Sequence, residues 1–526
     1  MSRHFLVIRL GSLGDVLLTS AALINLRISF PDCRITCLTK RRFAGLVAAM
    51  TGVDEVIAID NDAGFSALFK LLQDLDNGRF TDIVDLHGNF RSWFLRQIVS
   101  ASQKTVYPKR RFERWQIVRT HQYPSQWPHT IDLYNDTVTQ LGGRVFCRRP
   151  VLPLHTLRPT TGDFQPSFHS SICIAPGAAH PNKQWPIARF ETVARELHKR
   201  HGCRIFWVVT RVDQGKAQLA SELRGESFVE LVDQPIEQLA TLFAQCRLVI
   251  ANDSGLMHLA SAVGTPVIGI FGPTHPSLGF APRGQFDRIV QVDESCRPCS
   301  LHGKKPCWRE ERYCFTRIQP EQVLAAAESI LTSRINTMPA LFVDRDGTLT
   351  VEKHFISDPA QLELIPGAAN ALAVMKQRGY HLVAVSNQSG VARGYFSEAD
   401  VRAVNLRLEE LLQAEGVALD GIYYCPHHPR GTVPEYARFC YCRKPNPGMA
   451  EQAARELGID LRRSLVIGDK LDDLHLGDIV GARSFLVRTG YGRKSDDRLR
   501  ESGTAAHRLV FDDLPAAVQH VVDHNL

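Results

Sequence analysis

Short apolar, β-prone runs alternate with helical segments along almost the whole chain. The run Phe5–Leu10, for example, leads through a glycine loop into the apolar helical segment Val16–Arg27. Such alternation is typical of parallel sheets covered by helices. It predicts an α/β fold, with strands at Phe5–Leu10, Arg34–Leu38, Glu55–Ile59, Asp82–Asp85, Ser171–Ala175, Arg204–Thr210, Leu248–Ala251, Pro266–Phe271, Leu341–Val343, His381–Val385 and Ser464–Ile467.

The alternation is interrupted twice. A chain of 526 residues is too long for one hydrophobic core, so domain boundaries are expected. Pro150–Pro166 is rich in proline, and Thr332–Pro339 is short, polar and ends in proline. We therefore predict three domains, residues 1–160, 161–335 and 336–526.

The composition is that of an ordinary globular protein, with 44% hydrophobic and 22% charged residues. The N-terminus lacks a signal-peptide cleavage site, and no apolar run approaches the roughly 18 residues of a membrane span. We therefore expect a cytoplasmic protein. Thirteen cysteines in such a chain indicate metal ligands or reduced thiols before disulfides.

The net charge of +7 is concentrated before residue 337, where 40 Lys+Arg face 30 Asp+Glu; the remainder has 22 against 25. A dense basic stretch contains Lys104, Lys109, Arg110, Arg111, Arg114 and Arg119. No nucleic-acid recognition motif accompanies it, so nucleic acid is not predicted as a partner. A phosphorylated acceptor, an anionic membrane surface or a merely solvated face each explain the stretch.

Four polar motifs of the C-terminal domain follow predicted strands or supply cations. Open α/β sheets bind ligands at the carboxyl ends of their strands, and phosphoryl transfer needs carboxylates, donors and cations together. The motifs are Asp344-Arg-Asp346-Gly-Thr348, Ser386-Asn387-Gln388-Ser389, Arg443-Lys444 and Gly468-Asp469-Lys470.

This ordered set resembles the haloacid dehalogenase (HAD) superfamily over residues 340 to about 492. The resemblance implies that Asp344 is a nucleophile forming an aspartyl-phosphate and that Asp346 protonates the leaving oxygen and then activates water. Ser386 and Lys444 would hold the phosphoryl oxygens. Mg²⁺ would be bound by Asp344, the backbone carbonyl of Asp346, and Asp469. Lys470 would support these carboxylates.

Two tight pairs of metal-binding residues precede Arg443. Cys425-Pro-His427 and Cys440-Tyr-Cys442 supply three thiolates and an imidazole, which is a structural Zn²⁺ set. Within the superfamily, this pattern occurs in two subgroups, heptose 1,7-bisphosphate 7-phosphatases and histidinol-phosphate phosphatases. Further motifs, Gly390–Phe396 and Cys442–Met449, are similar to those of the heptose enzymes. That resemblance implies substrate contacts at Glu352, Lys353, His354, Phe355, Ser386, Asn387, Gln388, Ser389, Arg443 and Lys444, and leaves the heptose anomer open.

The N-terminal region contains glycine-rich turns at predicted strand ends. Gly11-Ser-Leu-Gly14-Asp15 alone is also explained as a tight βα turn with a helix-start carboxylate. Lys183-Gln-Trp185-Pro186 lies just before a helix. The segment Asn252–His258 follows a strand and opens a helix, whose N–H groups suit a diphosphate.

Together these segments resemble glycosyltransferase family 9, the ADP-heptose:lipopolysaccharide heptosyltransferases, over about residues 1–331. The resemblance implies a GT-B fold of two Rossmann-like lobes, the first for acceptor and the second for nucleotide sugar. Asp15 would be the base that deprotonates the acceptor hydroxyl, and Lys183 would offset charge on the ADP leaving group. The implied ADP site is Asp253, Ser254, Gly255, Met257 and His258; a packed helix-start histidine also explains His258.

A second cysteine group, Cys296, Cys299, Cys307 and Cys314, has spacing that permits a zinc or iron–sulfur site. Reduced structural cysteines also explain it.

Both resemblances imply one pathway, heptose units for the lipopolysaccharide inner core. The expected substrates are heptose 1,7-bisphosphate, ADP-heptose and a lipopolysaccharide core acceptor at the inner-membrane surface, where the protein would lie peripherally. Two rival hypotheses remain. Histidinol phosphate could replace the heptose bisphosphate, or the N-terminal region could be a catalytically silent docking module.

Overall fold

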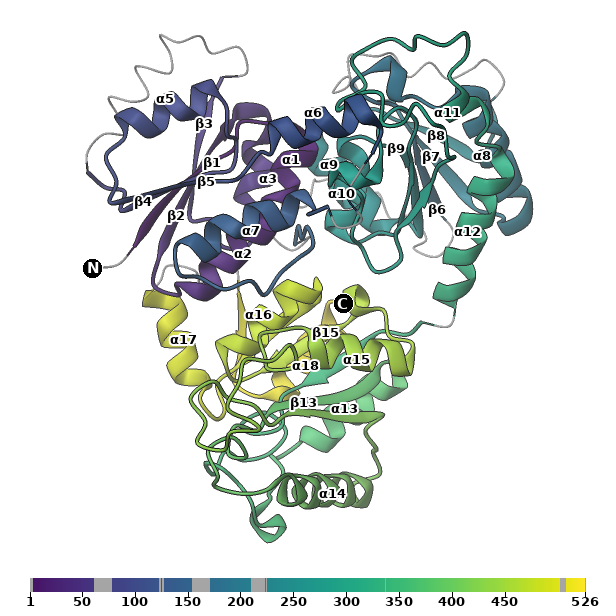
Figure 1. The fold of residues 1–526 in the computed structure, drawn as a ribbon. Helices are drawn as coiled ribbons and strands as arrows, with labels where there is room; N and C mark the ends of the chain where they lie inside the picture. Colours follow the sequence, from purple (N-terminus) through teal and green to yellow (C-terminus); the bar gives the residue numbers. More distant parts are fainter. Residues whose placement is uncertain are drawn as a thin grey trace. The chain divides into compact units, whose positions relative to one another are not determined.

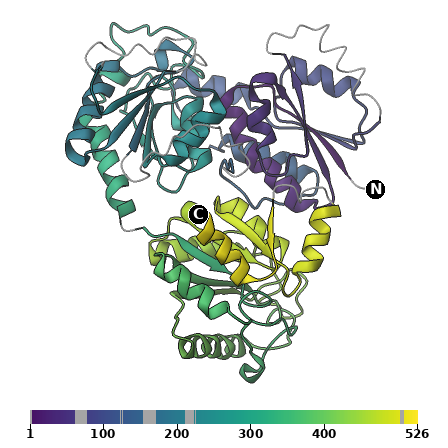
Figure 2. The same cartoon turned by 180° about the vertical axis from the view of Figure 1, so that it is seen from behind.

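The computed structural model describes residues 3–60, 78–122, 124, 127–153, 171–209, 223, 225–335, 337–501 and 508–525. The chain forms two compact units, Met1–Ser333 and Arg334–Leu526. The first unit contains two parallel sheets and the second contains one (Figure 1; Figure 2 shows the reverse side). The predicted boundary at 160/161 lies outside the described residues.

The first sheet has the strand order β3-β2-β1-β4-β5, in which the order reverses beside β1. Its strands are β1 (His4–Ile8), β2 (Arg34–Lys40), β3 (Glu55–Ile59), β4 (Asp82–Asp85) and β5 (Gln103–Val106). Its helices are α1 (Leu13–Leu18), α2 (Ser20–Ser29), α3 (Ala44–Ala48), α5 (Phe90–Ile98), α6 (Arg111–Thr120) and α7 (Thr130–Gln140).

The second sheet has the order β11-β10-β9-β6-β7-β8. Its strands are β6 (Ser171–Ala175), β7 (Arg204–Val208), β8 (Val229–Val232), β9 (Leu248–Asn252), β10 (Val267–Ile270) and β11 (Arg288–Val290). Its helices are α8 (Ile187–His201), α9 (Ile236–Gln245), α10 (Gly255–Val263), α11 (Tyr313–Thr316) and α12 (Pro320–Ile335).

The C-terminal unit is built on the parallel order β14-β13-β12-β15-β16-β17. Its strands are β12 (Ala340–Val343), β13 (His381–Asn387), β14 (Gly421–Cys425), β15 (Leu465–Gly468), β16 (Arg483–Val487) and β17 (Leu509–Phe511). Its helices are α13 (Ala368–Gln377), α14 (Glu398–Ala414), α15 (Gly448–Leu457), α16 (Leu471–Val480), α17 (Gly492–Glu501) and α18 (Leu514–Asp523). The central strand β12 is fully buried between apolar clusters on the two faces of the sheet.

The predicted helix Val16–Arg27 is instead two helices, α1 and α2, that meet at Thr19. The hydroxyls of Thr19 and Ser20 donate to the carbonyls of Val16 and Leu17, each at 2.6 Å, and such local bonds compete with the helical ladder. Apart from β16, the strands missing from the prediction lie at sheet edges, where short polar segments such as β5 pair on one side only. Within the described residues, no helix combines the length and apolar character needed to cross a membrane.

Candidate active sites

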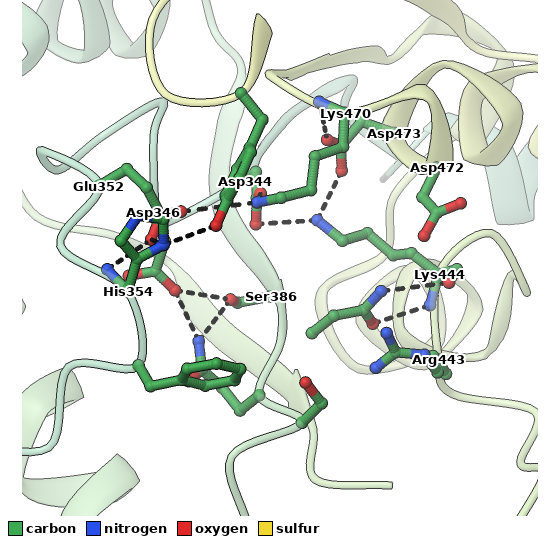
Figure 3. A pocket seen from close by; sticks show the side chains of 15 residues that line it. Asp344, Asp346, Glu352, His354, Ser386, Arg443, Lys444, Lys470, Asp472 and Asp473 are labelled. Carbon is green, nitrogen blue, oxygen red and sulfur yellow. Dashed lines mark hydrogen bonds and ion pairs between the residues drawn. The ribbon is translucent and has the colours of Figure 1, made fainter. Parts of the chain in front are cut away.

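Three neighbouring strands of the C-terminal unit bring the predicted phosphatase motifs together. Asp344 follows β12, Ser386 lies near the end of β13, and Asp469 follows β15. Because β12 pairs in parallel with both other strands, their carboxyl ends share one edge of the sheet. A pocket opens there (Figure 3), lined by Asp344, Asp346, Glu352, His354, Phe355, Ser386, Asn387, Gln388, Ser389, Arg443, Lys444, Lys470, Asp472, Asp473 and Tyr491.

Buried opposite charges surround Asp344. The Lys444 ammonium lies 2.9 Å from Asp344 Oδ1 and 2.5 Å from Asp473 Oδ1, and all three side chains are almost completely buried. Lys470 Nζ lies 3.6 Å from Asp344 Oδ2. Burial alone would raise the pKa of Asp344, but these two ammonium groups outweigh it and hold the pKa below its ordinary value. Asp344 is therefore an ionised carboxylate, as a nucleophile requires.

Asp346 is held in one orientation by its own neighbour. The guanidinium of the buried Arg345 donates to both oxygens of Asp346, at 2.9 and 3.0 Å, and is anchored by the Asn405 side chain at 2.8 Å. Gln388 Nε2 donates to Asp346 Oδ2 and to Ser386 Oγ, both at 2.7 Å. This network points the Asp346 carboxylate into the pocket beside Asp344 (Figure 3).

The carboxylates of Asp344, Asp469 and Asp473 converge closely enough to share a metal ion. Asp469 is fully buried, and its Oδ1 accepts no hydrogen bond among the described residues, although the Lys470 ammonium lies 3.2 Å away. Burial and the charge of Asp344 raise the pKa of Asp469 to about 8. A divalent cation bound by oxygen ligands would relieve this repulsion, so the donor set fits Mg²⁺.

The rim of the pocket is aromatic. Tyr491 Oη lies 2.7 Å from His354 Nδ1, the ring of Phe355 packs edge-on against Tyr395, and Tyr491 lies against the Lys470 ammonium. His354 and Phe355 both have positive φ angles, 53° and 57°, so the loop turns sharply where it meets the pocket.

The prediction that Lys353 contacts substrate is not supported. Its ammonium binds Gln361 O at 2.9 Å and Glu363 at 3.1 Å, and Lys353 does not line the pocket. The backbone turns sharply at His354 and Phe355, and these two residues and Glu352 line the pocket, whereas Lys353 does not. Sequence reasoning also missed Asp472, Asp473 and Tyr491, which line the pocket. The two aspartates sit in the first turn of α16, directly after the predicted Asp469-Lys470 motif, and that spacing was the available signal.

The predicted zinc residues meet in one cluster beside this pocket. The sulfur atoms of Cys425, Cys440 and Cys442 lie 3.2–3.3 Å from one another, and His427 Nδ1 lies 3.4 Å from Cys442 Sγ. The backbone N–H of Arg443 donates to Cys440 Sγ at 3.3 Å. The cluster therefore adjoins the backbone that presents Arg443 and Lys444.

In the N-terminal unit, Asp15 belongs to a polar triad with the buried residues Arg9 and Tyr134, and its own side chain is 22% exposed. Arg9 Nη2 lies 2.6 Å from Asp15 Oδ2, and Arg9 Nη1 donates to the Tyr134 hydroxyl at 2.8 Å. Tyr134 in turn donates to Asp15 Oδ1 at 3.4 Å. The backbone N–H and the hydroxyl of Ser12 both donate to Asp15 Oδ2, at 3.3 and 3.0 Å. Burial would raise the pKa of Asp15, but Arg9 and Ser12 outweigh it and lower the pKa. Asp15 is thus ionised, with its orientation set from several sides.

The predicted donor residues gather at the start of α10. Lys183 Nζ lies 2.6 Å from Asp253 Oδ2, which also accepts from Thr274 at 2.6 Å. Ser254 is the N-cap of α10, and its hydroxyl is buried without a partner among the described residues, as is His258 Nδ1. Burial lowers the pKa of His258 to about 4, so its imidazole is neutral.

Two glycines allow the acceptor and donor motifs to meet. A Cβ on Gly14 would lie 2.6 Å from His258 Cδ2, and a Cβ on Gly255 would lie 2.8 Å from Leu13 Cδ2. The starts of α1 and α10, from different sheets, are therefore in direct contact.

Met257 differs from its predicted role, because its side chain is fully buried against Gly269 of β10. Neighbouring side chains point to different sides of a helix, and that of Met257 packs against the sheet. Its backbone is therefore the part that could face a ligand.

The second cysteine group does not form a comparable cluster. Among the described residues, the groups of three or more potential ligands that converge do not include Cys296, Cys299, Cys307 or Cys314. Cys299 Sγ lies 3.7 Å from Pro273 O and Cys307 Sγ 3.7 Å from Glu311 O. Burial raises the pKa of Cys299, and Cys296 and Cys307 are still near enough to raise it further.

Comparisons with known proteins find relatives of both units. The sequence matches glycosyltransferase family 9 (heptosyltransferase) over residues 68–307 and the HAD-hydrolase-like family over residues 441–517. It is 40% identical over 188 residues to the D-glycero-β-D-manno-heptose-1,7-bisphosphate 7-phosphatase of Photorhabdus laumondii, a match covering 35% of this chain and 97% of that protein. The protein of the same name from Pasteurella multocida is 47% identical over 179 residues, covering 32% of this chain and 96% of that protein. A family 9 glycosyl transferase structure from Veillonella parvula shares the fold of the N-terminal unit, with a TM-score of 0.50 and 22% identity, covering 63% of this chain and 97% of that one.

Proposed function

This chain joins a glycosyltransferase family 9 domain to a member of the D-glycero-β-D-manno-heptose-1,7-bisphosphate 7-phosphatase family, and on that premise we propose a reaction for each site. The C-terminal site removes the 7-phosphate of D-glycero-β-D-manno-heptose 1,7-bisphosphate. The observation that carries this proposal is the buried Asp344 carboxylate, held between Lys444 and Lys470 and beside Asp346 in one pocket. The β anomer is taken from the names of the relatives.

In the first step, an oxygen of Asp344 attacks phosphorus, and the bond between phosphorus and the sugar O7 breaks. Asp346 gives its proton to the departing O7. The resulting aspartyl-phosphate is hydrolysed when Asp346 takes a proton from an attacking water, which restores Asp344 and releases phosphate. Lys444 and the Ser386 hydroxyl bind the phosphoryl oxygens throughout, which stabilises the charge that they gain.

Mg²⁺ would be held by Asp344, the Asp346 backbone carbonyl and Asp469, and the converging carboxylates of Asp344, Asp469 and Asp473 support this. The cation would offset repulsion between the carboxylates and the substrate phosphate. Zn²⁺ fits the cluster of Cys425, His427, Cys440 and Cys442. For His427 Nδ1 to bind zinc, Nε2 must carry the ring proton. The Arg438 guanidinium, 2.9 Å from Nε2, is then expected to turn away.

The test is incubation of the full chain with the heptose bisphosphate and Mg²⁺. We expect release of one phosphate and a heptose 1-phosphate product. Asp344→Asn should abolish release, whereas Asp497→Asn, a matched change of an exposed carboxylate on α17, should not. Near-normal turnover by Asp344→Asn would refute the assignment. Faster hydrolysis of histidinol phosphate would favour the rival substrate.

For the N-terminal unit, we propose transfer of heptose from ADP-heptose to an inner-core lipopolysaccharide acceptor. The contact between the Asp15 and His258 motifs supports it, because base and donor site must be adjacent for an inverting displacement. Asp15 would take the acceptor proton, and Lys183 would stabilise the ADP leaving group. Such an acceptor is part of a lipid, so we propose that the enzyme works at the inner face of the inner membrane. Failure of the wild type to transfer heptose to any core acceptor would favour the silent docking module.

A further inference from the structure

Four large aromatic side chains are exposed near the starts of two neighbouring helices. Phe90 and Trp93 on α5 are 65% and 45% exposed, and Phe112 and Trp115 on α6 are 70% and 50% exposed. Side chains of this size are rarely left in water on adjacent elements without a binding role.

The starts of the two helices lie near each other because the helices follow paired strands. β4 and β5 pair in parallel, and α5 and α6 begin five residues after their respective ends, at the same edge of the sheet (Figure 1). Arg111 Nη2 donates to Gly88 O at 2.8 Å, which ties the start of α6 to the loop that opens α5.

The same surface is strongly basic. Residues 87–121 contain eight Lys+Arg and one acidic residue, Glu113. Arg91 and Arg119 are exposed among the aromatic groups, and the Arg119 guanidinium lies 5.3 Å from the centre of the Trp115 ring. We call Phe90, Arg91, Trp93, Phe112, Trp115 and Arg119 the aromatic–basic surface.

We propose that the aromatic–basic surface docks the protein on an anionic lipid bilayer. Aromatic side chains enter the headgroup layer, and nearby cations attract anionic lipids. Phe90 packs on Trp93 at 5.6 Å and Phe112 on Trp115 at 5.8 Å, both in stacked geometry, so each pair forms one compact apolar group. Single-stranded nucleic acid is disfavoured because no nucleic-acid recognition motif accompanies these residues.

The aromatic–basic surface lies at the same edge of the sheet as the proposed acceptor base. Asp15 follows β1, which pairs with β4, so the base and the aromatic–basic surface share the carboxyl edge of one sheet. The inference deepens the proposed membrane location, but vesicle binding can be measured without any sugar nucleotide. Its failure is therefore distinguishable from a failure of heptose transfer.

The experiment is co-sedimentation of the full chain with vesicles of phosphatidylcholine alone or mixed with phosphatidylglycerol. We expect binding to the mixed vesicles only, weakened by added salt. Replacing all four aromatic residues by Ser, or making Arg91→Glu with Arg119→Glu, should each reduce the bound fraction by roughly tenfold or more. The changed side chains are exposed, so the variants should melt like the wild type.

The matched controls replace the same kinds of side chain outside the aromatic–basic surface. Trp308→Ser removes another indole, 77% exposed, and Arg493→Glu with Lys494→Glu reverses two exposed charges on α17. Both controls should bind vesicles like the wild type. The proposal is overturned if the wild type ignores anionic vesicles or binds both vesicle types equally. It is also overturned if surface and control variants behave alike, or if the surface variants only abolish nucleic-acid binding or self-association.

Discussion

In both sites, the charge of a single carboxylate is set by basic side chains that lie beside it in the fold. Asp344 is ionised because Lys444 and Lys470 outweigh the cost of its burial. Asp15 is ionised for a similar reason, with Arg9 as the principal counter-charge. The same pairing has a cost, since a carboxylate stabilised as an anion accepts a proton less readily.

Asp15→Asn should reduce heptose transfer by roughly 10²–10⁴-fold, the usual scale of general-base catalysis. ADP-heptose affinity should change little, because the proposed donor contacts come from Lys183 and the start of α10. Transfer to a heptose-deficient lipopolysaccharide acceptor, measured beside donor affinity, checks this.

Phosphate release by the same variant serves as its control and should be normal, since that site lies in the other unit. If Asp15 were only a helix-start carboxylate, the variant would lose under about 1 kcal/mol of stability and keep its transferase activity. Wild-type transfer by Asp15→Asn would therefore remove Asp15 from the mechanism.

At the scale of elements, the contact between α1 and α10 depends on Gly14. Gly14→Ala places a methyl group against the buried His258 ring, so it should cost about 1–3 kcal/mol and slow transfer. Gly45→Ala is the matched control. Its methyl group would lie 2.6 Å from Glu237 Oε1, the end of a flexible side chain that can move aside. Equal effects of the two substitutions on urea unfolding and transfer would contradict this account.

The loop between β14 and α15 depends on its thiol cluster. Cys440→Ser combined with Cys442→Ser should release one zinc per chain and destabilise the C-terminal unit by about 4 kcal/mol or more, as metal loss typically does. Metal analysis and thermal unfolding measure both effects.

The control pair, Cys296→Ser with Cys307→Ser, lies outside the tight ligand groups found among the described residues and should leave zinc content unchanged. Zinc lost from the control, or kept by the Cys440/Cys442 variant, would contradict the assignment.

At the scale of the whole molecule, an ion pair joins the parts of the N-terminal unit that carry its two sheets. Arg283 donates to both oxygens of Asp132 on α7, at 3.0 and 2.7 Å. Burial would raise the pKa of Asp132, but Arg283 outweighs it and lowers the pKa below 3.8. The ion pair therefore stabilises the folded unit at pH values above 3.8, and this stabilisation is lost as the pH falls through the lowered pKa of Asp132.

Arg283→Met should then cost about 1 kcal/mol at neutral pH, because the pair is partly exposed and screened by solvent. The difference from the wild type should shrink below pH 3.8. Urea unfolding across the acid range measures it. A difference that stays constant with pH would mean that Arg283 acts through packing or its bond to Arg148 O instead.

The sequence by itself determined the α/β class, most central strands and the strand-end motifs, because apolar periodicity and motif order are local properties. The same local order predicted that Asp344, Ser386 and Asp469 share one edge of the sheet, and the spacing of the cysteines predicted a Cys/His cluster that could hold a metal ion. Only the tertiary structure decided which side chains reach each site. In the folded chain, Lys353 pairs with Glu363 outside the pocket, Tyr491 lies at the pocket rim, and the Met257 side chain is buried against β10. The tertiary structure also set Arg9 against Asp15 and joined the start of α6 to the loop before α5. These outcomes depend on contacts between residues far apart in the chain, and on side-chain directions that loop geometry sets, and neither leaves a periodic signal in the sequence.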